Sequence, residues 1–64
     1  MYNITIYKKA CITYIKAHKN NNPISVAISE AYYDEYYKAM RYGYTNEELL
    51  NIYKEIYLKL KAFM

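Results

Sequence analysis

The chain has 64 residues, of which 55% are hydrophobic, and a formal net charge of +3. A chain of this length forms one domain, here residues 1–64, near the lower size limit for folding alone, and its apolar content excludes disorder. The single cysteine excludes an intramolecular disulfide, and no apolar run is long enough to span a membrane. With no signal peptide in the sequence, we expect a cytoplasmic protein.

Residues 3–18 are predicted to form the first helix. Side chains suited to a core recur at the three- and four-residue intervals of one helix face, and these are Ile4, Tyr7, Cys11, Tyr14, Ile15 and His18. The β-branched residues near the start also allow a short strand over residues 2–7. Such a strand would have no partner in the rest of the chain, so a helix is the better prediction.

The second helix is predicted over residues 23–41. Pro23 suits the first position of a helix, where its missing N–H costs nothing, and Asn22 before it can cap the helix. Two neighbouring columns of side chains, one large and one mostly small, form the expected core face. The columns are Ile28, Tyr32, Tyr36 and Met40, and Ala27, Ala31, Glu35 and Ala39.

Tyr33 and Tyr37 lie outside this core face, although they belong to the sequence YYDEYY of residues 32–37. With 3.6 residues per turn, they fall about a quarter turn or more beyond it. Tyrosine, methionine and arginine are enriched at the centres of protein interfaces. We therefore predict a partner-binding surface that consists of Tyr33, Tyr36, Tyr37, Met40 and Arg41. The alternative is a central second helix that is packed on two sides, with the first helix covering half of each tyrosine.

The third helix is predicted over residues 46–63. Thr45 and Glu48 have the T-x-x-E spacing of a capping box, and Tyr44 and Leu49 can form a hydrophobic staple around it. Gly43 can end the preceding helix because it is free to adopt a positive φ. The third helix would bury a stripe of Leu49, Ile52, Tyr53, Ile56, Leu60 and Phe63, which Leu50, Tyr57 and Met64 widen on one side. Together the elements predict an all-α, compact three-helix bundle with the second helix at its centre.

Basic side chains are concentrated near the N-terminus. Residues 1–29 contain no acidic side chain, whereas all six carboxylates lie between Glu30 and Glu55. A patch for nucleic acid or an acidic partner is therefore possible on the first helix, formed by Lys8, Lys9, Lys16 and Lys19. A solvated helix face explains the same lysines without a ligand.

A degenerate helix–turn–helix is the second feature that could bind nucleic acid. Gly43 and Leu49 fall at the spacing of the turn glycine and a buried residue of that motif. Against it, Lys38 occupies an apolar position of the motif. Glu47 and Glu48 would also face the phosphates and weaken binding.

No catalytic, metal or cofactor motif stands out. The chain has one histidine and one cysteine, whereas a metal site needs several converging ligands. Cys11 is predicted to be a small buried hydrophobe, and His18 a structural residue near a helix end. Glu35 is predicted to pair with a lysine of the first helix or to lie at the rim of the bundle. We expect no enzymatic activity, no cofactor and no metal.

The overall character of the chain resembles that of small accessory proteins of phages and mobile elements, among them anti-CRISPR and other anti-defence inhibitors. Small size, a preference for lysine over arginine, and abundant Asn, Ile and Tyr, as in AT-rich genomes, carry the resemblance. It implies an inhibitor that occludes a protein in the cytoplasm of a bacterial host. We therefore predict a non-enzymatic helical protein that acts by protein–protein contact, on a host protein or on itself. The alternative is a small nucleic-acid-binding or regulatory protein.

Overall fold

The computed structural model describes residues 2–19 and 26–63 of the chain. These ranges hold three helices, α1 (Ile4–Lys19), α2 (Val26–Arg41) and α3 (Asn46–Ala62), and no strand. The all-α three-helix fold is therefore confirmed, as is a helix rather than a strand near the N-terminus. The predicted start of the second helix at Asn22 and Pro23 lies outside the described residues.

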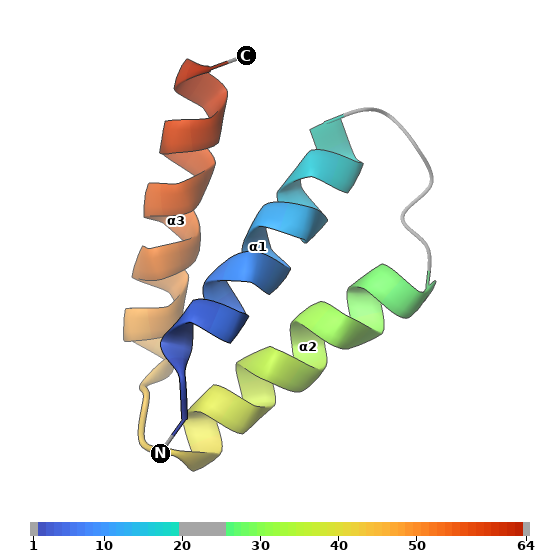
Figure 1. Cartoon of the computed structure of the whole chain (residues 1–64). Coiled ribbons are helices and arrows are strands. Elements are labelled where there is room, and N and C mark those ends of the chain that lie inside the picture. The colour runs from blue at the N-terminus through green and yellow to red at the C-terminus, as the bar shows by residue number, and fades with distance from the viewer. Residues whose placement is uncertain (1, 20–25, 64) are drawn as a thin grey trace.

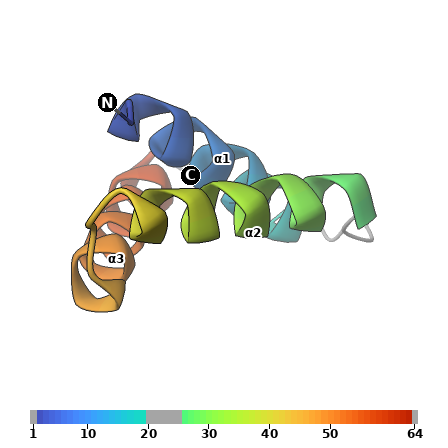
Figure 2. The ribbon, with the colours of Figure 1, turned by 90° about the horizontal axis from the view of Figure 1, so that it is seen from below.

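α1 is the central helix of the fold. It packs against both α2 and α3, whereas α2 and α3 make few contacts with each other (Figure 1). Seen from below, α2 and α3 meet at the turn that joins them and then run in different directions (Figure 2). The prediction that the second helix lies at the centre is therefore wrong. Spacing along a helix shows which residues share a face, but it does not show how many neighbours cover that helix.

The segment before α1 is fixed to α2. The Asn3 Oδ1 accepts a hydrogen bond from the Thr5 N–H at 3.0 Å and caps the helix. Tyr2 is buried, its ring stacks on Tyr42 at 5.7 Å, and its hydroxyl donates to the Glu35 carboxylate at 2.7 Å. Glu35 is thus part-buried and has Tyr2 as its partner, rather than a lysine of α1, which was one of its two predicted settings. Burial, together with the bond to Glu35, raises the pKa of Tyr2.

α2 ends at a glycine, as predicted. Gly43 has a φ of 105°, which other residues rarely adopt. Its N–H donates to the Met40 carbonyl at 3.1 Å, and the Tyr44 N–H donates to the Ala39 carbonyl at 3.2 Å. This pair of bonds is the Schellman motif, which satisfies carbonyls that the helix end would otherwise leave free.

α3 begins with the predicted capping box. The Thr45 Oγ1 accepts from the Glu48 N–H at 3.1 Å, and the Thr45 N–H donates to the Glu48 Oε1 at 3.2 Å. Tyr44 and Leu49, the two residues of the predicted staple, both belong to the core cluster. These contacts fix the turn between α2 and α3 from local sequence alone.

The core is built on tyrosine. Tyr7 is fully buried, and its hydroxyl donates to the Leu49 carbonyl at 3.0 Å and lies 3.5 Å from the Tyr32 hydroxyl. Burial, together with hydrogen bonds to Tyr32 and Cys11, raises the pKa of Tyr7. Cys11 is also fully buried, as predicted. Among the described residues, no buried side-chain N or O atom lacks a partner, so these rings are buried without the penalty of an unpaired hydroxyl.

Several side chains predicted for the core lie outside it. Met40, Leu50 and Tyr57 are 40%, 51% and 45% exposed, so the buried faces are narrower than predicted, since α2 and α3 each pack mainly against α1. Met64 lies outside the described residues. Ala27 and Ala31 are also exposed, and Phe63 at the end of the predicted α3 stripe is 88% exposed. These predictions are wrong because α2 and α3 both diverge from the C-terminal half of α1 (Figure 1). The accessible surface is 4874 Å², compared with about 4,300 Å² expected for a globular monomer of this mass, which agrees with an open arrangement.

Candidate functional site

An exposed row of side chains runs along α2 outside its buried face. We name it the outer stripe, and it consists of Val26, Glu30, Tyr33, Tyr37 and Arg41. Successive members are three or four residues apart, which keeps them on one helix face. The exposed fractions are 71% for Val26, 49% for Tyr33 and 55% for Tyr37. Tyr32 and Ala39 mark the opposite, buried side of the same helix.

The predicted partner-binding residues differ in their surroundings. Tyr33, Tyr37 and Arg41 lie on the outer stripe, and Met40, which is 40% exposed, lies at its edge. Tyr36 is part-buried and packs against the core. The alternative of a central, doubly packed α2 is wrong. Its other part, a tyrosine half covered by the first helix, holds for Tyr33, which is 49% exposed and whose side chain interacts with Tyr14 of α1.

Buried rings support the exposed tyrosines. The Tyr33 and Tyr32 rings pack in a T-shape at a centroid distance of 5.2 Å, and so do Tyr37 and Tyr36 at 5.5 Å. Both supporting rings in turn contact Tyr7, at 6.0 Å and 6.4 Å. Because the supporting rings are fixed in the core, Tyr33 and Tyr37 are partly ordered before any partner arrives, which lowers the entropy cost of binding.

Two more tyrosines extend the aromatic cluster to α1 and α3. Tyr14 stacks on Tyr32 at 4.8 Å, and Tyr53 contacts both rings, at 6.4 Å and 5.8 Å. The His18 ring packs edge-on against Tyr14 at 4.8 Å. Burial raises the pKa of Tyr14 and of Tyr53, and the interaction with the Tyr33 side chain adds to the rise in the pKa of Tyr14. The sequence placed both residues on core faces but held no signal that they would meet Tyr32.

Charges on the exposed side of α2 are separated by sign. Glu30 and Asp34 lie in its N-terminal half, and Lys38 and Arg41 lie in its last turn. This order also favours the helix dipole. The outer stripe therefore has an acidic end, an aromatic centre and a basic end.

The predicted basic patch lies on α1. Lys8, Lys9 and Lys16 are exposed, while the side chain of Lys19 lies outside the described part of the structure. Tyr7 and Tyr14 point into the core and do not interleave with these lysines. A shallow groove of about 280 Å³ lies beside Lys9, between α1 and α2, and its other lining residues are Ala10, Thr13, Ala27, Ile28 and Ala31.

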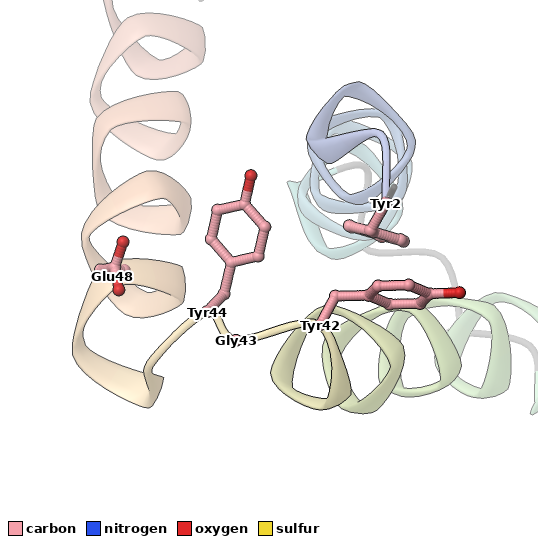
Figure 3. A pocket seen from close by; sticks show the side chains of 5 residues that line it. All are labelled: Tyr2, Tyr42, Gly43, Tyr44 and Glu48. Atoms are coloured by element: carbon pink, nitrogen blue, oxygen red, sulfur yellow. The ribbon is translucent and has the colours of Figure 1, made fainter.

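A second hollow, of about 300 Å³, lies at the turn between α2 and α3. Figure 3 shows the rings of Tyr2 and Tyr42 lying roughly parallel, with Tyr44 beside them and Glu48 on α3. The Tyr2 hydroxyl already donates to Glu35, and the Glu48 carboxylate already accepts from Thr45. These side chains hold the turn together, and we assign no ligand to this hollow.

Within the described ranges, no three His, Cys, Asp or Glu side chains gather into a possible metal site. None of the described helices has the length and apolar character needed to cross a bilayer. Comparisons with protein families, with curated proteins and with solved structures found no match. The outer stripe is therefore interpreted from its own chemistry.

Proposed function

We propose that this protein is a non-enzymatic binding module that acts by protein–protein contact through the outer stripe of α2, together with Met40. One observation carries the proposal. Tyr33 and Tyr37 are about half exposed beside the buried face of α2, and rings that belong to the core or pack against it hold them in place.

The residue types of the stripe favour a protein partner. Tyrosine and arginine are the side chains that most often dominate binding energy at protein interfaces, and Met40 adds an adaptable apolar contact. Blocking a surface of a host protein, as the resemblance to anti-defence inhibitors implies, requires a binding face of this kind and no catalytic group.

The test combines a fold measurement with a binding measurement. We expect the double variant Tyr33→Ala/Tyr37→Ala to keep its helical circular dichroism and its cooperative melting while losing self-association and the capture of partners from a bacterial lysate. Leu58→Ala, which removes a side chain that is 57% exposed on α3, is the matched control and should keep both. Loss of the fold in the double variant would show that these tyrosines serve the core, and unchanged binding would contradict the proposal.

Nucleic-acid binding through α1 is the second candidate function. It is favoured by the exposure of Lys8, Lys9 and Lys16 on a helix that contains no acidic residue. Contacts with phosphate release counterions, so the affinity for a DNA or RNA oligonucleotide should fall steeply with salt. Reversing the three charges with glutamate should abolish that binding. A response to salt that is flat would exclude this candidate.

A further inference from the structure

Resting on the proposed function, we propose that the partner of the outer stripe is a second copy of this chain, with the two α2 helices packed antiparallel. A two-fold axis then crosses α2 between Asp34 and Tyr37. Tyr33 of each copy faces Tyr37 of the other, and Glu30 of each copy faces Arg41 of the other.

The distribution of charge selects this arrangement. Glu30 and Arg41 lie at opposite ends of the outer stripe, with Tyr33 and Tyr37 between them. An antiparallel pair brings the acidic end of each stripe onto the basic end of the other, and the two-fold symmetry repeats this contact. A parallel pair would instead bring Glu30 onto Glu30 and Arg41 onto Arg41, which is repulsive.

The exposed apolar area fits a weak dimer. About half of each tyrosine ring is open, so the pair leaves on the order of 200 Å² uncovered. With Val26 and Met40 the patch reaches a few hundred Å², comparable with the roughly 300–600 Å² of the largest patch on a typical monomer. Two such patches bury less than the about 1,600 Å² of a standard stable interface. The dimer is therefore expected to form in the micromolar range and to dissociate on dilution.

The rings are suited to pairing with themselves. Tyr33 and Tyr37 are each turned edge-on to the ring that supports them, at interplanar angles of 71° and 85°. Tyrosine rings prefer offset-stacked or edge-to-face neighbours, and two such pairs about the axis would each add to the association. The Tyr37 hydroxyl can stay at the rim of the contact, in water, while the Tyr33 side chain keeps its interaction with Tyr14 of α1.

The first measurement is sedimentation velocity of the full chain over a range of concentrations. We expect a monomer–dimer equilibrium in the micromolar range, and monomer throughout for Tyr33→Ala/Tyr37→Ala, with Leu58→Ala behaving like the wild type. A wild-type chain that stays monomeric at several hundred micromolar would overturn the inference.

A charge exchange tests the antiparallel arrangement directly. Glu30→Arg and Arg41→Glu should each weaken the dimer about tenfold, because symmetry replaces two attractive contacts by two repulsive ones. The variant that carries both changes restores opposite charges and should recover the wild-type dissociation constant within about threefold. If the double variant loses as much free energy of dimerisation as the two single variants together, the antiparallel arrangement is wrong.

The two proposals fail in different ways. If the wild type is monomeric but captures a lysate protein that Tyr33→Ala/Tyr37→Ala does not capture, the dimer is excluded and the proposed function stands. A double variant that unfolds would sink the proposed function itself, because the tyrosines would then belong to the core.

Discussion

The two ends of the molecule differ in how completely they are packed. At the closed end, where α1 begins and α2 meets α3, Tyr2, Tyr7 and Leu49 are buried and two capping motifs fix the turn. At the open end the helices separate, and Val26 and Phe63 are mostly exposed (Figure 1). The closed end therefore holds the fold together, and the open end and the outer side of α2 carry apolar surface that the fold does not need.

This difference shows how tyrosine can form both the core of a small domain and an exposed surface suited to binding. Inside, the Tyr7 hydroxyl finds the Leu49 carbonyl and the Tyr32 hydroxyl. Outside, Tyr33 and Tyr37 are about half exposed while their rings rest on the rings of Tyr32 and Tyr36.

The largest effect is expected at the closed end. Tyr7→Ala removes a fully buried ring and the hydrogen bond to Leu49, and it should cost about 3–5 kcal/mol. A domain of this length has roughly 3–10 kcal/mol of stability in total, so the variant should lose a large part of it and unfold at a much lower temperature than the wild type by circular dichroism. Leu58→Ala at an exposed site is the control. A cooperative transition in Tyr7→Ala at the wild-type temperature would show that the closed end does not hold the fold.

Alkaline pH should loosen the closed end in the same way. Burial raises the pKa of Tyr7 and of Tyr2 in the folded chain, while an unfolded tyrosine titrates near 10. The folded state thus binds these protons more tightly, and the stability they contribute is complete below pH 10 and is lost as the pH rises beyond it. Each group should lower the free energy of unfolding by about 1.4 kcal/mol per pH unit above 10.

Urea titrations at pH 9, 10 and 11 measure this slope. The variant Tyr7→Phe cannot ionise at this position, so its stability should fall less steeply over the same range. Equal slopes for the two proteins would mean that Tyr7 ionises as easily in the folded chain as in the unfolded one.

An intermediate effect is expected at the start of α3. Thr45→Ala removes the side chain that caps Glu48, and this should cost about 1 kcal/mol. Thr13→Ala is the matched control, because Thr13 is an exposed threonine within α1 whose hydroxyl only bonds back to the Lys9 carbonyl. Alanine is the better helix former there, so Thr13→Ala should leave the stability unchanged or slightly higher. If the two variants lose the same free energy of unfolding, the cap at Thr45 has no special role in stability.

The smallest effect is expected at the open end. Phe63→Ala deletes a ring that is 88% exposed, and thermal melting should change by less than about 0.5 kcal/mol in free energy. A loss of 2 kcal/mol or more would mean that this end is packed in solution, and the contrast between the two ends would then disappear.

The features of the fold that depend on neighbouring residues were predictable from the sequence. Thr45 and Glu48 form the capping box, and Gly43 takes the positive φ, because both devices are complete within a few residues. The central role of α1 was not predictable, since it depends on how three amphipathic helices share their apolar faces. For the same reason the burial of Tyr2 against α2, and the exposure of Phe63, could be seen only in three dimensions.

The candidate site was predictable in part. Helical spacing alone places Tyr33 and Tyr37 outside the core column of Tyr32, and the structure shows both about half exposed. The ring contacts of Tyr7 with Tyr32 and Tyr36 could not be predicted from the sequence, because they join residues of two helices. Whether the stripe binds a partner stays a prediction for the experiments above.

The one cysteine can report how often the core of the protein opens. Cys11 is fully enclosed between α1 and its neighbours, and burial raises the pKa of its thiol. A thiol reagent such as a disulfide dye can react with it only in molecules whose core has opened. The labelling rate, divided by the rate for the unfolded chain, therefore gives the fraction of open molecules at any moment. Every variant proposed above that keeps Cys11 can be compared on that scale, without an added label and under native conditions.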